Sequence, residues 1–200
     1  MHPSAKKFAE LFFEQYIDNL PKDNDSADAR VLVEVGAGSD GTFRLLASEK
    51  ASYHPVDRAQ SEDPNIPYKL DFESESVDII CCSSVFEHDI FFWVTFLECM
   101  RILKPHGLLY LQAPSNGPDH KYPVDCWRFY PDSGKALEKW ARYNSYRPLL
   151  LETFINATCH ESAGWRDWIA VYVKDDTCES LYNGRISNVY RGRWDGWNAV

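Results

Sequence analysis

Apolar positions along the chain follow two alternating patterns. Near-continuous apolar runs predict buried strands, because a strand that helices cover on both faces has no polar side; such runs cover residues 31–35, 77–85 and 108–114. Apolar residues spaced three or four positions apart predict helices over 4–19, from near Thr42, and over 91–103 and 131–143. Shorter or later runs add strands at 53–57, 69–73, 148–158 and 167–174.

Strands and helices thus alternate along most of the sequence. This order predicts an α/β fold with a largely parallel sheet and helices on both of its faces. In such folds ligands bind beyond the carboxyl ends of the strands. We expect a single domain over 1–200, made of an N-terminal helix and linker (1–29), a cofactor-binding half (30–114), a substrate-side half (115–174) and a polar tail (175–200).

Composition narrows the function classes. The 200 residues carry 21 Lys and Arg against 30 Asp and Glu, a net charge of −9, which argues against a general affinity for nucleic acid. No apolar stretch approaches the roughly 20 residues that cross a bilayer, and the N-terminus lacks the pattern of a signal peptide. The six cysteines form no CxxC pair, which predicts buried thiols in the reducing cytoplasm and no structural zinc.

A glycine-rich turn follows the first buried strand. Glu34 ends this strand, and Gly36 and Gly38 let the backbone turn sharply and approach a ligand closely. The charge of Glu34 suits a ligand that carries an ammonium group. Asp57 ends the second strand, at a spacing where an acid accepts hydrogen bonds from ribose hydroxyls. Asp71 and Phe72 offer a carboxylate and a ring face to an adenine.

Three motifs in this order resemble the class I S-adenosylmethionine-dependent methyltransferases, and especially their small-molecule group. VLVEVGAGSDG resembles the first motif of that family, DFESESVDIICCSSVFEH its region between the third and fourth strands, and FLECMRILKPHGLLYLQAP its segment leading into the fifth strand. HKYPVDCWRFYPDSGKAL further resembles a segment of bacterial members. The resemblance implies a Rossmann-like fold with a seven-stranded, mostly parallel sheet whose last strand is antiparallel.

The resemblance also implies S-adenosylmethionine as the cofactor, S-adenosylhomocysteine as the product, and a role for each matched position. The methionine end of the cofactor would be held by Glu34, Val35, Gly36, Ala37, Gly38 and Ser39. Asp57, with Arg58, would hold the ribose, and Asp71 and Phe72 would frame the adenine. The wall beside the transferred methyl group would be formed by Ser83, Ser84 and Phe86.

Catalytic candidates are histidines, because a hydroxyl acceptor must lose a proton and the pKa of histidine lies near working pH. His88 follows the fourth strand of the resemblance, and His120 lies in the next long loop with Asp119 and Asp125 nearby. We therefore predict catalytic roles for His88, His120 and Asp125 and no metal. The alternative, a divalent cation held by His120, Asp119 and Asp125, stays open.

The function that this predicts is methyl transfer to a small polar acceptor, such as a hydroxyl of a sugar or secondary metabolite. The alternatives are an N-methyltransferase, an enzyme acting on RNA or protein, and a binding module without catalysis. The partners that we expect are a small-molecule substrate and a second copy in a homodimer, with neither nucleic acid nor a membrane. Arginine and tryptophan residues in the 175–200 tail predict a lid or an oligomer contact, and a solvated tail is the alternative.

Overall fold

The computed structural model describes residues 3–17, 30–38, 41–47, 50–56, 69–156 and 165–198. Three of the predicted cofactor residues, Ser39, Asp57 and Arg58, lie outside these ranges, as does Cys159.

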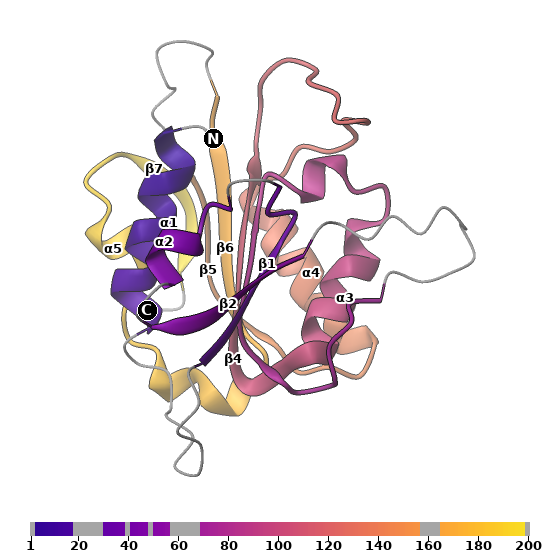
Figure 1. The fold of residues 1–200 in the computed structure, drawn as a ribbon. Helices are drawn as coiled ribbons and strands as arrows, with labels where there is room; N and C mark the ends of the chain where they lie inside the picture. Colours follow the sequence, from indigo (N-terminus) through magenta and orange to yellow (C-terminus); the bar gives the residue numbers. More distant parts are fainter. Residues whose placement is uncertain are drawn as a thin grey trace.

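A seven-stranded sheet runs through the centre of the molecule in the order β2-β1-β3-β4-β6-β5-β7 (Figure 1). Its strands are β1 (Arg30–Val35), β2 (Ala51–Val56), β3 (Val77–Ser83), β4 (Leu103–Pro114), β5 (Leu149–Asn156), β6 (Asp167–Val173) and β7 (Trp194–Asn198). The first four strands are parallel neighbours, whereas β6 pairs antiparallel with both β4 and β5, and β7 pairs antiparallel with β5. The predicted mixed sheet, mostly parallel with an antiparallel last strand, is confirmed.

Helices cover both faces of this sheet, as the doubly buried strands require. One face carries α1 (Pro3–Tyr16), α2 (Arg44–Ala47) and α5 (Ile186–Val189), and the other carries α3 (Phe92–Ile102) and α4 (Pro131–Tyr143) (Figure 1). Two 3₁₀ turns, η2 (Phe86–His88) and η3 (Asp176–Leu181), complete the described elements. No helix in the described ranges has the length and apolar character needed to cross a membrane.

The two faces build two separate hydrophobic clusters. In β3, Ile79 and Cys81 pack toward α1, while Ile80 and Cys82 pack toward α3. This alternation is the period of two of a strand, and it explains why the run reads as apolar at every position.

The strand predicted at 69–73 does not form. Residues 71 and 72 bend, and the segment pairs with no neighbouring strand of the described sheet. Side chains of α3 hold it instead: Glu98 accepts from the backbone N–H of Leu70 at 2.7 Å, and Arg101 donates to the carbonyls of Leu70 and Phe72 at 3.1 and 2.9 Å. A strand-like sequence is therefore fixed by side chains in place of a ladder of backbone hydrogen bonds.

Much of the tail packs onto the rest of the domain, and its role as a lid or an oligomer contact stays a prediction. It supplies η3, α5 and the edge strand β7. Glu152 of β5 is fully buried and accepts hydrogen bonds from the Tyr16 hydroxyl of α1, from the N–H groups of Ile186 and Ser187, and from the Ser187 hydroxyl. Arg185 is 2% exposed and donates to the carbonyls of residues 151, 182 and 184.

Candidate functional site

The carboxyl ends of the central strands meet at one edge of the sheet. Val35 of β1 pairs with Cys82 of β3, and Ser83 of β3 pairs with Gln112 of β4. The loops that follow these strands therefore start side by side, at the edge where open α/β sheets bind ligands.

The glycine turn after β1 has the backbone that its sequence predicts. Gly36 and Gly38 have φ of +74° and +54°, in the left-handed region that favours glycine. The N–H of Gly36 donates to the carbonyl of Val56 at 2.7 Å, and a Cβ at Gly36 would collide with the side chain of Val85. At Gly38 a Cβ would meet nothing within 4 Å, so this exposed backbone leaves room for a ligand.

Glu34 anchors this turn from inside the protein. Its carboxylate is 3% exposed and accepts from the N–H groups of Thr42 and Phe43 at 2.6 and 3.0 Å and from the Tyr53 hydroxyl at 2.7 Å. Burial, followed by the hydrogen bond to Glu34, raises the pKa of Tyr53 well above its ordinary value. The partners that the structure gives Glu34 are thus protein groups that fix the start of α2, and a contact with a ligand ammonium stays a prediction.

The predicted adenine frame lies beside the last turn of α3, which leads into the start of β4. The Asp71 side chain is exposed, and Phe72 is half-buried with its ring edge-on to His54 at 6.0 Å between centroids. Because Arg101 and Glu98 hold this bend, its carboxylate and ring are presented at fixed positions. Sequence reasoning did not identify these two supporting residues.

A cavity of about 550 Å³ opens beyond β3 and β4. It is lined by Ser84, Glu87, His88, Pro114, His120, Lys121, Tyr122, Trp165 and Asp167. Ser84, His88 and His120 were predicted from the sequence, and the fold brings them to one wall. Phe86 is 2% exposed and packs in the core against Phe92 and Phe129, so it supports this wall only from behind.

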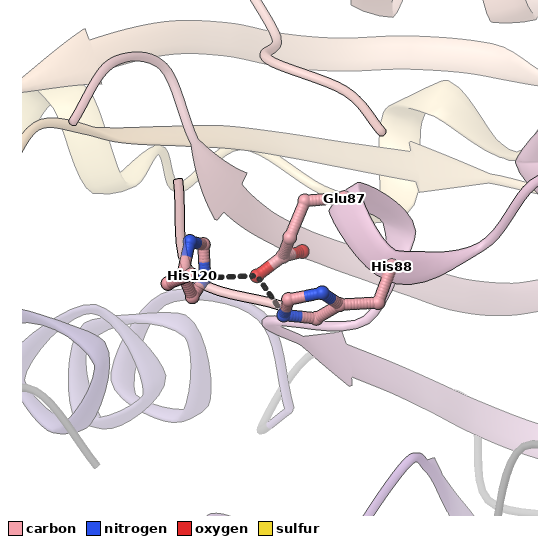
Figure 2. A group of neighbouring side chains, drawn as sticks. All are labelled: Glu87, His88 and His120. Atoms are coloured by element: carbon pink, nitrogen blue, oxygen red, sulfur yellow. Dashed lines mark ion pairs between the residues drawn. The ribbon is translucent and has the colours of Figure 1, made fainter. Parts of the chain in front are cut away.

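Glu87, His88 and His120 form a compact cluster at the cavity, here called the Glu–His cluster (Figure 2). Oε1 of Glu87 lies 3.6 Å from Nε2 of His88 and 4.0 Å from Nε2 of His120. The Glu87 side chain is fully buried, and neither carboxylate oxygen accepts a hydrogen bond from the part of the chain that the structure describes. Burial, reinforced by the charges of Asp125 and Asp167, raises the pKa of Glu87 to about 8.

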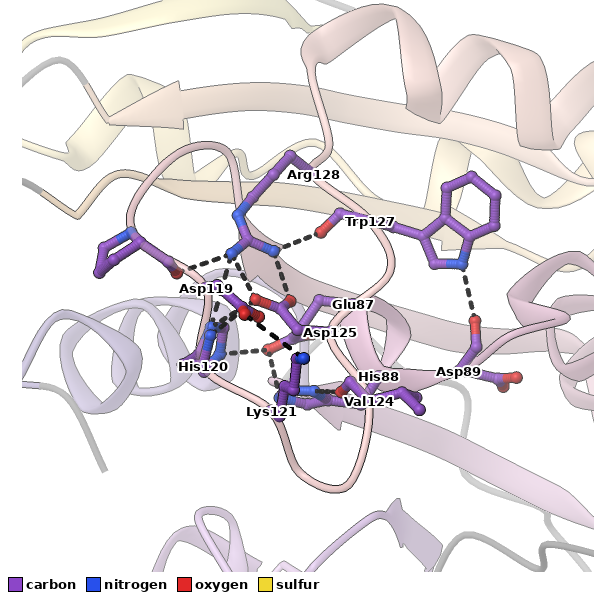
Figure 3. A network of polar contacts seen from close by, with 11 residues as sticks. Glu87, His88, Asp89, Asp119, His120, Lys121, Val124, Asp125, Trp127 and Arg128 are labelled. Atoms are coloured by element: carbon purple, nitrogen blue, oxygen red, sulfur yellow. Dashed lines mark hydrogen bonds and ion pairs between the residues drawn. The ribbon is translucent and has the colours of Figure 1, made fainter.

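Both imidazoles are oriented through their other nitrogen (Figure 3). Nδ1 of His88 lies 2.6 Å from the carbonyl of Val124, and because a carbonyl only accepts, Nδ1 carries the hydrogen. Nδ1 of His120 lies 3.1 Å from Oδ2 of Asp125. These bonds direct the Nε2 atoms of both rings toward the carboxylate of Glu87.

Asp125 is held in turn by Arg128, which binds it with two hydrogen bonds of 2.6 and 2.7 Å. The hydrogen bonds from Arg128 hold the pKa of Asp125 well below its usual range. Asp125 therefore lies where it can position His120, and its catalytic role stays a prediction. Asp119 is exposed and pairs with Lys121 at 3.8 Å, so the cation set of His120, Asp119 and Asp125 does not assemble.

Sequence reasoning missed Glu87, Trp165 and Asp167. Glu87 stands beside His88 directly after a buried strand, a signal that was available. Trp165 packs edge-on against His120 at 4.9 Å between centroids, and Asp167 begins the antiparallel strand β6. Nothing local in the sequence indicates that this strand enters the sheet beside β4 and brings both residues to the cavity.

Comparisons with known proteins agree on the fold. Residues 33–111 match a family model described as a methyltransferase domain. The CurJ carbon methyltransferase has a similar structure, with a TM-score of 0.54, 16% identity, and coverage of 86% of this chain and 54% of the other, so the chain spans about half of that protein. A SAM-dependent methyltransferase from Archaeoglobus fulgidus has a TM-score of 0.53, 14% identity and coverage of 84% and 93%.

The [4+2]-cyclase SpnF is similar as well, with a TM-score of 0.55, 12% identity and coverage of 85% and 81%. A search by sequence among curated proteins finds no match. At these identities the structural likeness shows the fold, and the chemistry has to be argued from the site.

Proposed function

We propose that this chain, which contains a class I S-adenosylmethionine-dependent methyltransferase domain, transfers a methyl group to the hydroxyl of a small polar acceptor such as a sugar or secondary metabolite. The observation that carries the proposal is the cavity beyond β3 and β4, whose wall combines Ser84 with the Glu–His cluster. The described residues of the glycine turn fit the cofactor, since they expose backbone at the carboxyl edge of the sheet. A contact of Asp71 and Phe72 with the adenine stays a prediction.

The size of the cavity favours a small acceptor. A volume of about 550 Å³ lies within the roughly 300–1,000 Å³ that small-molecule sites occupy. The lining is mostly apolar, and its two imidazoles and the carboxylates of Glu87 and Asp167 offer hydrogen-bonding groups to the hydroxyls of a ligand. The ring of Trp165 offers a face or edge against which such a ligand can pack.

S-adenosylmethionine supplies an activated methyl group on a positively charged sulfur. The bond from that methyl carbon to sulfur breaks as the bond to the acceptor oxygen forms, and the hydroxyl proton has to leave. The protein aligns the two atoms and excludes water. The Glu–His cluster faces the acceptor cavity, so we place the removal of this proton there.

The cytoplasm is the compartment that we propose for this reaction. The described cysteines Cys81, Cys82 and Cys99 are buried thiols, whereas Cys126 and Cys178 are unpaired nearer the surface. Thiols in this state fit a reducing compartment.

The test is a screen with methyl-labelled S-adenosylmethionine against sugars and hydroxylated metabolites, combined with calorimetry of S-adenosylhomocysteine. We expect label on an acceptor oxygen. Replacing His120 or His88 by Ala should lower turnover about 10²–10⁴-fold while the affinity for S-adenosylhomocysteine stays within a few-fold.

Label found on a nitrogen or on a macromolecule would contradict the proposed small-molecule hydroxyl acceptor and identify the acceptor class instead. A folded protein that binds S-adenosylhomocysteine and methylates no acceptor in the screen would be a binding module. Unchanged turnover in both histidine variants would remove the Glu–His cluster from the reaction.

A further inference from the structure

We propose that Glu87, His88 and His120 bind a single divalent transition-metal ion of the zinc type in the wall of the acceptor cavity. The cation-binding set considered from the sequence was His120, Asp119 and Asp125, and of these the structure brings only His120 into the Glu–His cluster. The binding is independent of the proposed function, whereas the use of the ion in catalysis rests on it.

The spacing of the three side chains fits a shared ion better than a hydrogen-bonded network. One ligand atom from each residue lies within 4.8 Å of the other two. The distances from Glu87 Oε1 to the two Nε2 atoms, 3.6 and 4.0 Å, exceed those of hydrogen bonds. Tetrahedral zinc with bonds of about 2.0–2.2 Å separates its ligand atoms by about 3.3–3.5 Å, so closure around an ion takes side-chain movements of about 1 Å or less.

The second nitrogen of each ring supports the same interpretation. Metal-binding histidines almost always donate their other N–H to a carbonyl or carboxylate, which fixes the tautomer and the ring orientation. His88 makes this bond to the Val124 carbonyl, and Nδ1 of His120 lies 3.1 Å from Oδ2 of Asp125 in a similar arrangement. Arg128 then fixes Asp125 through its paired hydrogen bonds. Nε2 of His88 is thus in the form that binds a metal, and the carboxylate of Asp125 next to Nδ1 favours the same form of His120.

The buried carboxylate is an independent observation that points to a cation. Glu87 is 0% exposed, and both of its oxygens lack a hydrogen-bond donor in the described part of the chain. Burial without hydrogen-bond donors disfavours the charged carboxylate, and coordination to a metal is one of the arrangements that compensate for this cost. Asp125 and Asp167 add negative charge nearby and Arg128 offsets one charge, so the surroundings attract a cation.

Two imidazoles and one carboxylate leave at least one coordination position open. This donor set is that of catalytic zinc sites, in which the open position takes water or substrate. In this structure that position lies at the cavity, because all three residues line it. An acceptor hydroxyl bound there would have its pKa lowered and would release its proton to water, so His120 would act as a ligand and the ion would polarise the acceptor.

The test is calorimetric titration of Zn²⁺ into purified, chelator-treated full-length protein, with Co²⁺ absorption and Mn²⁺ as further probes. We expect one saturable site per chain. Glu87→Gln and His120→Ala should each weaken Zn²⁺ binding at least 100-fold, and Asp125→Asn about 10–100-fold because it acts only through the orientation of His120. Thermal unfolding with and without Zn²⁺ confirms that each variant is folded and that the ion stabilises only proteins that bind it.

His106→Asn is the matched control, since it removes an imidazole near Asp78, next to the start of β4 and away from the cavity residues. Its affinity for Zn²⁺ should equal that of the unmodified protein. Absence of saturable binding for all three ions, or equal binding in folded Glu87→Gln, would overturn the proposal.

The same preparations separate this failure from failure of the proposed function. Methyl transfer that persists in protein without bound metal would leave the methyltransferase proposal intact and show that the ion plays no part in turnover. Metal binding without any binding of S-adenosylhomocysteine would support the metal site and contradict the proposed methyltransferase function.

Discussion

The hydrogen bonds of Glu34 lead to a quantitative prediction for the cofactor turn. Glu34→Gln keeps the size of the side chain but removes its charge and one acceptor oxygen. The carboxylate now accepts from Thr42, Phe43 and Tyr53, and hydrogen bonds to a charged group contribute about 1.5–3 kcal/mol each. Because the amide NH₂ would face one of these donors, we expect a loss of about 2–4 kcal/mol in the free energy of unfolding.

Tyr53→Phe removes only one of the three bonds and leaves the two backbone donors satisfied. Since the Tyr53 side chain is partly exposed, we expect a smaller loss of about 1 kcal/mol. At about 2–4 °C of Tm per kcal/mol for a domain of this size, both losses are measurable by thermal unfolding.

The functional readout is the affinity for S-adenosylhomocysteine, measured by calorimetry. A looser turn should weaken binding about 10-fold or more in Glu34→Gln and only a few-fold in Tyr53→Phe. Glu138→Gln is the control, because Glu138 forms only a surface ion pair with Arg142 at 3.2 Å. If Glu34→Gln keeps both the unfolding free energy and the affinity of the unmodified protein, the anchoring role assigned to Glu34 is wrong.

Three other substitutions test the fold around the site. Gly36→Ala places an alanine in the left-handed region, at a cost of about 1–2 kcal/mol, and its Cβ would collide with the side chain of Val85. Calorimetry should therefore show weak or no binding of S-adenosylhomocysteine. An affinity equal to that of the unmodified protein would contradict the turn geometry. Burial opposes ionisation of Asp78, but hydrogen bonds, including one from Lys104, lower the pKa of its carboxyl group overall. The ionised Asp78 carboxylate therefore stabilises the fold above pH ~4, and this stabilisation is lost as the pH falls through the pKa of the folded state. The deficit of Asp78→Asn in urea unfolding should be large at pH 7 and shrink toward pH 3, and a constant deficit would refute this. Glu152→Ala leaves four donors of α1 and the tail without their acceptor, so we expect a loss of about 3–5 kcal/mol in denaturant unfolding, and a loss below about 1 kcal/mol would contradict the network.

The local pattern of apolar residues was sufficient to predict most of the helices and strands. The helix predicted over 131–143 is α4 (Pro131–Tyr143), and the strand predicted over 167–174 is β6 (Asp167–Val173). The structure of two other segments, of which the sequence predicts only 69–73 as a strand, depends on distant partners. The 69–73 segment has a strand-like sequence but lies against Glu98 and Arg101 of α3, and the polar tail becomes the edge strand β7 because β5 offers it a free edge.

The sequence by itself determined the α/β fold and the glycine turn, because these depend on hydrophobic period and on backbone freedom at Gly36 and Gly38. The class of cofactor is predicted from the order of the motifs, through the family that they resemble. Tertiary structure alone decided the acceptor site. Glu87 and His88 follow β3, His120 lies in the loop after β4, and Trp165 and Asp167 arrive with an antiparallel strand from farther along the chain. Whether a carboxylate is buried without a donor, and which nitrogen of an imidazole faces it, depends on what packs around it, and no spacing in the sequence encodes that environment.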